Sequence, residues 1–213
     1  MGIKRIVDFI LSLLALIFLS WLFLILCIAI KIDSPGPILF KQKRVGLHKT
    51  HFNILKFRTM RTDTPHDAPT HELSDPKKWI TKVGAFLRKT SLDELPQLFN
   101  ILKGDMSFVG PRPERPEIAK EYEKDMPEFA LRLQVKAGLT GYAQVYGKYN
   151  TTPYDKLKMD LTYIEKYSFW MDLKLMLLTF KILFQKENTE GIESWQTSAA
   201  INENRDELNG EKK

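Results

Sequence analysis

The stretch FILSLLALIFLSWLFLILCIAI, residues 9–30, decides how the rest of this chain is organised. It is 22 residues long without a charge, and such a helix would measure about 33 Å, enough to cross a hydrocarbon core of roughly 30 Å. A cleaved signal peptide has a shorter apolar region, so we predict a retained membrane helix. The alternative of an apolar helix buried in the core of a soluble domain stays open.

The charges that flank this segment predict how it sits in the membrane. Lys4 and Arg5 precede it, and residues 31–61 carry eight Lys and Arg against the single acidic residue Asp33. Basic flanks stay in the cytoplasm. Because both flanks are basic, we predict that residues 1–34 form a re-entrant helix that enters and leaves the membrane through the same, cytoplasmic leaflet. The rest of the chain is then expected on the cytoplasmic side.

The composition excludes several classes of protein. The chain has 213 residues, 44% of them hydrophobic, and a net charge of +6, which suits one lean domain plus an anchor. Its only cysteine is Cys27, so no intramolecular disulfide and no cysteine metal cluster can form. We predict a compact domain over residues 35–185 and a polar, flexible tail over residues 186–213.

Local patterns predict a mostly α-helical domain with one small β hairpin. Pro35-Gly36-Pro37 ends the membrane helix, and short strands are expected at 38–40 and 52–57 around a turn at 46–49. Helices are expected at 83–87, 95–102, 114–125, 127–134, from 152 onward and at 169–184. The last carries three charges, so it packs on the core or lies as an amphipathic helix in the head-group plane.

Two further patterns concern local structure. Ser91-Leu92-Asp93-Glu94 has the form of a capping box that opens the helix over 95–102. The polar segment 62–75 is predicted to be a loop. It contains His66 and His71, but no third ligand stands at a fixed spacing, so we do not predict a metal site there.

A pair of adjacent carboxylates, Asp93 and Glu94, is the first candidate for chemistry. Such pairs in a first helical turn often only stabilise the helix, so alone they are weak evidence. Arg88 stands five residues before Asp93, and Pro111-Arg112-Pro113 follows the same helix. Two prolines fix the backbone around one guanidinium, an arrangement suited to holding a phosphate.

Four blocks of sequence carry a resemblance to a known family. They are FRTM at 57–60, SLDELPQL at 91–98, LKGDMSFVGPRP at 102–113 and GLTGYAQV at 138–145. Together they resemble the monotopic phosphoglycosyl transferases of the bacterial sugar transferase family. The resemblance extends from the membrane segment to about Phe184.

The resemblance implies transfer of a sugar phosphate from a UDP-sugar to undecaprenyl phosphate with release of UMP, the first membrane step of exopolysaccharide, capsule or glycoprotein glycan assembly. It implies that Asp93 forms a covalent phosphosugar intermediate and that Glu94, the second catalytic residue, binds Mg²⁺. The substrate-binding residues that it implies are Lys56, Arg58, Arg88, Pro111, Arg112 and Gln144. It also implies that the protein lies in the inner leaflet of a bacterial inner (cytoplasmic) membrane.

The sequence departs from the family pattern at two places. Ser20-Trp21 stands where the family usually has Ser-Pro, so the usual cause of a bend is missing. Tyr142, Tyr146 and residues 148–149 differ near the expected donor site, so the transferred sugar is not predicted.

The sequence also bears on two other classes of function. A non-catalytic, membrane-tethered interaction protein remains the alternative to an enzyme. No nucleic-acid partner is expected, because the basic stretch lacks a recognisable binding motif. The oligomeric state is not predicted.

Overall fold

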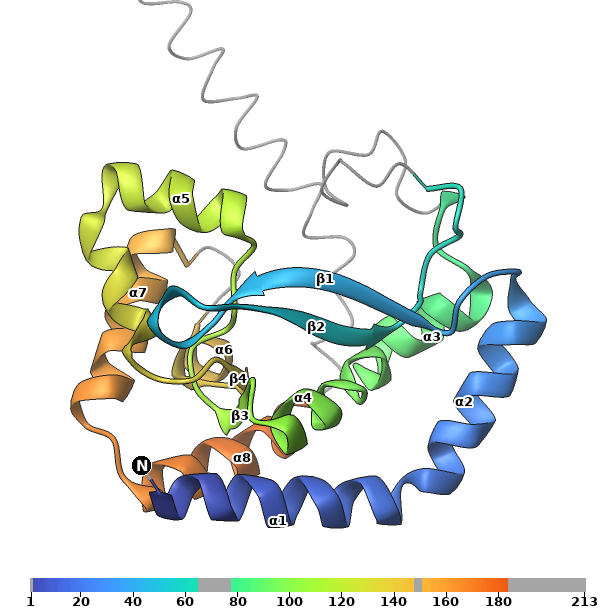
Figure 1. Ribbon diagram of the computed structural model, residues 1–213, viewed down its shortest axis with the longest axis horizontal. Coiled ribbons are helices and arrows are strands. Elements are labelled where there is room, and N and C mark those ends of the chain that lie inside the picture. The colour runs from blue at the N-terminus through green and yellow to red at the C-terminus, as the bar shows by residue number, and fades with distance from the viewer. Residues whose placement is uncertain (1, 65–77, 148–150, 184–213) are drawn as a thin grey trace, which may run out of the picture.

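The computed structural model describes residues 2–64, 78–147 and 151–183 (Figure 1). His66, His71, most of the predicted 62–75 loop and the predicted tail lie outside the described residues.

The N-terminal apolar segment forms two helices, α1 (Gly2–Phe18) and α2 (Ser20–Asp33), that meet at Leu19 with a bend of 62°. Within the described ranges, no helix taken alone has the length and apolarity to cross a membrane, and only this bent pair meets both requirements jointly. The prediction of a bent rather than a straight helix is confirmed. Its insertion into a membrane stays a prediction.

The bend follows from packing on two different parts of the domain. Ala15 and Leu16 of α1 pack on a core cluster that includes Ile101, whereas Leu26 and Ile30 of α2 are buried in a second cluster. Figure 1 shows α1 along the lower edge and α2 rising from its end around the domain. Much of α1 faces outward, so the alternative of a helix buried in the core is wrong.

Polar contacts attach the start of α1 to the rest of the protein. Lys4 forms an ion pair with Asp172 of α8 (Phe169–Leu183). Arg5 donates to the carbonyl oxygens of Ile101 and Leu102 at 2.6 and 2.7 Å, at the end of α4 (Gln97–Lys103). Cations at a helix C-terminus satisfy carbonyl groups that have no partner within the helix. The start of α1 is therefore fixed to the domain by both Lys4 and Arg5.

The predicted hairpin is confirmed and is longer than expected. β1 (Leu39–Val45) pairs antiparallel with β2 (His51–Phe57), with Leu39 opposite Phe57. The connection contains a short 3₁₀ turn, η1 (Leu47–Lys49). In Figure 1 the hairpin crosses the middle of the molecule, so its Phe57 end lies beside α3.

The remaining elements confirm a mostly helical domain. They are α3 (Lys82–Lys89), η4 (Leu92–Glu94), α4, β3 (Ser107–Val109), α5 (Pro116–Asp125), η5 (Pro127–Gln134), β4 (Gly138–Thr140), α6 (Tyr142–Tyr146), α7 (Pro153–Glu165) and α8. The segment 127–134 is a 3₁₀ helix rather than an α-helix. The parallel pair β3 and β4 and the short helix α6 were not predicted.

The predicted capping box at Ser91 is wrong. Ser91 has a left-handed backbone with a φ of 55° and makes no side-chain capping bond, whereas an N-cap serine needs an extended backbone. A 3₁₀ turn follows instead, and α4 begins only after Pro96. A capping box does form at the start of α7, where Thr152 Oγ1 accepts from the Asp155 N–H at 3.1 Å.

Candidate active site

Glu94 is held by two cations from distant parts of the chain. Its Oε1 atom lies 2.7 Å from Nζ of Lys56, in β2, and 2.6 Å from Nη2 of Arg112. Burial raises the pKa of Glu94, but Arg112 and Lys56 outweigh this effect and hold it well below its usual range. Glu94 is therefore a fixed carboxylate in the described structure.

Asp93, the neighbouring carboxylate, is held much more loosely. Its Oδ2 atom lies 3.9 Å from Lys56 Nζ, and within the described residues its carboxylate accepts no hydrogen bond. The side chain is only 14% exposed. Burial raises its pKa, opposed by Lys56 and reinforced by Glu94. A poorly solvated carboxylate without hydrogen-bond donors is suited to act as a nucleophile.

Arg88, on α3, lies near enough to Asp93 for their charges to interact. Burial lowers its pKa, while the charge of Asp93 acts in the opposite direction. Its Nε donates to Thr59 Oγ1 at 2.9 Å. This helix can lie so close to the chain after β2 because residue 84 is glycine: a Cβ at Gly84 would stand 2.1 Å from the Thr59 carbonyl oxygen. Sequence reasoning missed Thr59, although it lies in the FRTM block.

The Pro-Arg-Pro turn carries Arg112 on a backbone that is held at several points. The Pro111 carbonyl accepts from the Gly138 N–H, and the Pro113 carbonyl accepts from Nη1 of Arg44, both at 3.0 Å. The Arg112 side chain is about half exposed, and its guanidinium pairs with Glu94. The coulombic effect of Glu94 raises the pKa of Arg112 further above its usual value, so this side chain stays charged.

Two other predicted substrate-binding residues lie in different settings. Arg58 is buried, and its guanidinium donates to Pro37 O at 2.6 Å, Ser34 Oγ at 2.7 Å and Ser34 O at 2.8 Å, where α2 ends. These bonds engage three of the five N–H donors of the guanidinium. Arg58 therefore attaches the end of α2, and no described contact joins it to Asp93 or Glu94, so its substrate role stays a prediction.

Gln144 of α6 differs from Arg58, because the polar atoms of its side chain are not hydrogen-bonded to any described residue. Its Nε2 and Oε1 atoms are both buried and have no hydrogen-bond partner within the described residues. Such an unsatisfied polar group costs about 1–3 kcal/mol. The side chain is therefore a candidate to bind a polar ligand, which keeps the prediction open.

The carboxylates can contribute to a Mg²⁺ site only together with other ligands. Within the described residues, no group of three or more His, Cys, Asp or Glu is arranged to hold a metal. Mg²⁺ usually takes one or two carboxylates together with water and substrate phosphates. Among the described residues, Glu94 Oε2 has only a long contact of 3.4 Å, with Arg112 Nη1. This oxygen can accept a hard cation, so the residues fit such an ion.

The assembled site contains two carboxylates, one fixed and one loosely held, surrounded by Lys56, Arg88 and Arg112. It can bind anionic groups and offer a nucleophile. The sequence model of the family described as bacterial sugar transferases matches residues 1–186. The chain belongs to the bacterial sugar transferase family.

Curated relatives of this bacterial sugar transferase differ in the donor that their names give. A UDP-glucose:undecaprenyl-phosphate glucose-1-phosphate transferase from Xanthomonas campestris pv. campestris is 41% identical over 86% of this chain and 39% of its own length. One of the same name from Caulobacter vibrioides is 42% identical over 87% of this chain and 71% of its own length.

A third relative acts on a different sugar by its name. It is the UDP-N-acetylgalactosamine-undecaprenyl-phosphate N-acetylgalactosaminephosphotransferase of Aeromonas hydrophila, 37% identical over 85% of this chain and 43% of its own length. The chain thus spans less than half the length of two of these three relatives. Similar overall identity accompanies two different donor sugars, so identity alone does not assign the sugar.

Proposed function

We propose that this chain is a phosphoglycosyl transferase that moves a sugar phosphate from a UDP-sugar to undecaprenyl phosphate and releases UMP. The observation that carries the proposal is the unequal hold on the two adjacent carboxylates, with Glu94 bound by two cations and Asp93 free of hydrogen-bond donors within the described residues. The names of the relatives give the substrate classes, and initiation of a polysaccharide or glycan is the corresponding role.

The proposed reaction has two displacements at one phosphorus atom. An Asp93 oxygen attacks the phosphorus next to the sugar, and the bond from that phosphorus to the bridging oxygen breaks. UMP leaves with the bridging oxygen, and the sugar phosphate remains on Asp93 as an acyl phosphate. An oxygen of undecaprenyl phosphate then attacks the same phosphorus, which forms the lipid diphosphate and restores the Asp93 carboxylate.

The cations around the carboxylates reduce the repulsion between anions in both steps. Arg112 and Arg88 present guanidinium groups to phosphate oxygens, which bind such forks through paired N–H donors. Lys56 lies between the two carboxylates, closer to Glu94. A diphosphate that binds here would share Arg112 with Glu94, so the ion pair in the described structure keeps the arginine in place before the substrate arrives.

Glu94 is the residue proposed to hold Mg²⁺, through Oε2, the oxygen that has the long contact with Arg112. A bound Mg²⁺ would neutralise charge on the diphosphate and on the departing UMP. Asp93 keeps its role as the nucleophile.

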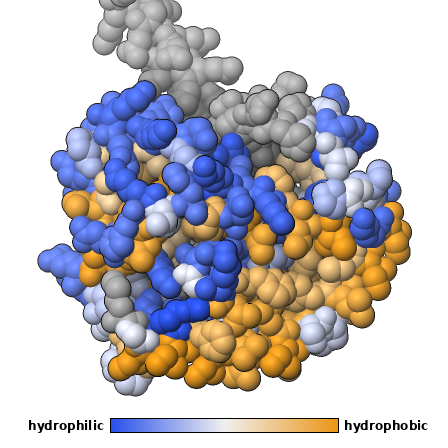
Figure 2. Space-filling view, in the orientation of Figure 1, coloured by the Kyte–Doolittle hydropathy of each residue, from blue (hydrophilic) through white to orange (hydrophobic). Residues whose placement is uncertain are grey.

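The apolar faces of α1 and α2 are proposed to lie in the membrane. Figure 2 shows hydrophobic residues gathered along the lower and right-hand edges, over these two helices. Ile17 and Phe18 beside the bend are 64% and 75% exposed, and Trp21 after it is 59% exposed. Bulky apolar side chains on this scale, grouped on one face, are typical of a membrane or partner contact.

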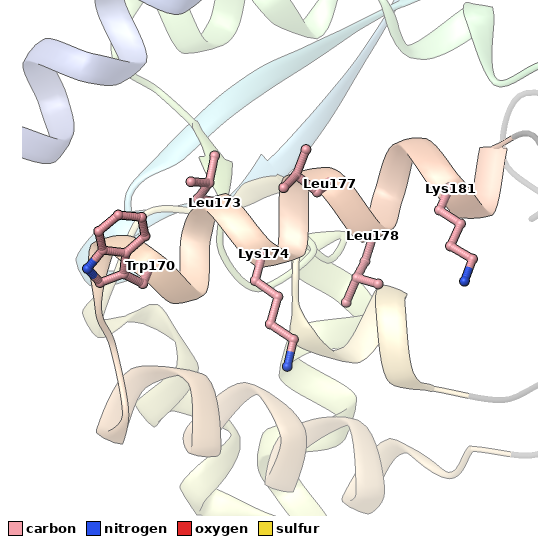
Figure 3. A pocket seen from close by; sticks show the side chains of 6 residues that line it. All are labelled: Trp170, Leu173, Lys174, Leu177, Leu178 and Lys181. Carbon is pink, nitrogen blue, oxygen red and sulfur yellow. The ribbon is translucent and has the colours of Figure 1, made fainter.

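The outer face of α8 extends this proposed membrane surface. Its groove is lined by Trp170, Leu173, Lys174, Leu177, Leu178 and Lys181 (Figure 3). Lys174 and Lys181 extend to one side of the helix in that view, beside Leu178. Apolar residues with lysines that reach outward suit the head-group region of an anionic bilayer.

A re-entrant arrangement agrees with the attachment of α1. Lys4 and Arg5 bind Asp172 and the end of α4, which belong to the same domain as Asp93. A straight span would carry these two cations across the bilayer and away from their partners. We therefore infer that both ends of the helix pair stay on the cytoplasmic side of the inner membrane.

The proposed function is tested with the full chain purified in lipid nanodiscs. UMP formation is measured with a panel of UDP-sugars, with and without undecaprenyl phosphate. We expect UMP and a lipid-linked sugar diphosphate from at least one donor. A non-catalytic, membrane-tethered interaction protein would give no UMP with any donor, and that result would overturn the proposal.

A further inference from the structure

Arg132 and Asp160 form a buried ion pair between η5 and α7. Asp160 Oδ2 accepts from Arg132 Nη2 at 2.6 Å and from Nε at 3.0 Å. Their side chains are only 5% and 2% exposed. Neither residue touches Asp93 or Glu94 in any described contact, and sequence reasoning did not single them out.

The Arg132 guanidinium also contacts the backbone of the Pro-Arg-Pro turn that carries Arg112. Nη2 of Arg132 also donates to the carbonyl oxygen of Arg112 at 3.0 Å. The Phe129 ring lies against the guanidinium, with its centroid 4.7 Å from Cζ. One side of the group is thus packed, and its donors connect α7 to the residue that pairs with Glu94.

Burial of this ion pair carries a cost in desolvation free energy. Two charges taken out of water lose solvation that their mutual attraction only partly restores, and a well-packed apolar pair of similar volume is often as stable. Burial raises the pKa of Asp160 in spite of Arg132, which reflects this cost. The contacts that an apolar pair cannot reproduce are the hydrogen bond to Arg112 and a longer ion pair of 3.8 Å with Glu114, whose side chain is still 25% exposed to water.

We propose that Arg132, held in place by Asp160, is a positioning residue that sets the backbone of Arg112 so that its guanidinium faces Glu94 and the substrate diphosphate. This inference rests on the proposed function for its effect on turnover. The positioning of the Arg112 backbone by Arg132 does not depend on the proposed function. Because displacement of a binding group by about 1 Å can reduce a rate about 100-fold, one backbone hydrogen bond is enough to matter.

The test replaces both charges together, since a single replacement would leave one buried charge unpaired and weaken the fold. The variant is Arg132→Met/Asp160→Leu in the full chain. Arg132→Lys keeps the charge and one donor group. Lys49→Met/Glu123→Leu is the matched control, because this ion pair, at 2.8 Å, also joins distant elements but is more exposed and makes no described contact with the turn.

The first readout needs no substrate. The Gly138 N–H donates to the Pro111 carbonyl, so its hydrogen exchange reports whether the turn stays in place. We expect at least tenfold faster exchange at Gly138 in Arg132→Met/Asp160→Leu, with no change at the Gly104 N–H that ends α4. Unchanged exchange at Gly138 in a folded variant would overturn the proposal, whether or not the wild type releases UMP.

The second readout is turnover under saturating UDP-sugar and undecaprenyl phosphate. We expect at least a tenfold loss of kcat in the double variant at a similar melting temperature, partial recovery in Arg132→Lys and no loss in the control. In an Arg112→Gln background the same double replacement should cause no further loss, because Arg132 acts through Arg112. A full, additive loss would contradict positioning, whereas absence of UMP from the wild type would overturn only the proposed function.

Discussion

Nζ of Lys56 lies 2.7 Å from Oε1 of Glu94. The same ammonium stands 3.9 Å from Asp93 Oδ2, so it forms a hydrogen bond with the second carboxylate and only a coulombic contact with the first. The β hairpin therefore contributes one cation that distinguishes two adjacent side chains. This unequal contact leads to a prediction about pH.

Lys56→Met should move the acid limb of the rate profile to higher pH. Burial raises the pKa of Asp93, and Lys56 is the strongest influence that lowers it. Only the carboxylate form of Asp93 attacks, so activity falls as the pH drops through the pKa of Asp93. Removal of the Lys56 charge raises this pKa further. The measurement is kcat/KM for UMP release against pH, with Lys103→Met, an exposed lysine outside the site, as control. An acid limb that stays in place would contradict this role.

Gly84→Ala should weaken both the fold and the site. The new Cβ would stand 2.1 Å from the Thr59 carbonyl oxygen, so α3, which carries Arg88, has to move. We expect a loss of about 1–3 kcal/mol in the free energy of unfolding and reduced UMP release. Chemical denaturation measures the first quantity. Gly2→Ala, with no atom within 4 Å of its Cβ, is the control and should unfold like the wild type.

Removal of Mg²⁺ should stop the reaction. Addition of EDTA is expected to abolish UMP release, and excess Mg²⁺ should restore it. Glu94→Gln should raise the Mg²⁺ concentration needed for half-maximal rate or eliminate turnover, because the amide is a weaker ligand for a hard cation. Full activity of the wild type in chelator would exclude the ion from the mechanism.

The re-entrant arrangement predicts the accessibility of the N-terminus. A cysteine at Gly2, in a Cys27→Ser background, should resist a membrane-impermeant thiol reagent in intact cells and react after lysis. Lys120→Cys in α5 is the control for intact cells, since it lies on the exposed surface of the domain. Labelling at position 2 while position 120 stays protected would show a straight span.

Elements with a local cause could be predicted from the sequence. The hairpin and the helices at 82–89, 116–125 and 153–165 follow from turn residues and apolar spacing within one segment. The strands β3 and β4 have three residues each and depend on close backbone approach: a Cβ at Gly138 would stand 2.1 Å from the Gly110 nitrogen. No periodicity can develop in three residues, so this sheet was not predicted.

The capping box shows how a motif fails when its context is incompatible. Ser91 adopts a left-handed conformation as the chain leaves α3, which takes its side chain out of the capping position. Pro96 then limits where α4 can begin. The sequence contained both residues, but the left-handed backbone of Ser91 between α3 and the 3₁₀ turn decided the outcome.

The site could be predicted only in its reactive residues. Asp93, Glu94 and Arg112 stand in recognisable blocks, whereas Arg132 and Asp160 support Arg112 from 20 and 48 positions away in the chain. Arg58 lies in such a block but binds the end of α2. Sequence blocks therefore identified candidate groups, and the fold decided which of them meet.

The central claim is tested most directly by the mass of the intact protein after mixing with an active UDP-sugar in the absence of undecaprenyl phosphate. We predict an increase equal to one sugar phosphate, located on the peptide that contains Asp93, with about one UMP released per protein molecule and no change in Asp93→Asn. Addition of undecaprenyl phosphate should remove the added mass. UMP release that requires the lipid and leaves the mass of the protein unchanged would contradict the covalent role of Asp93.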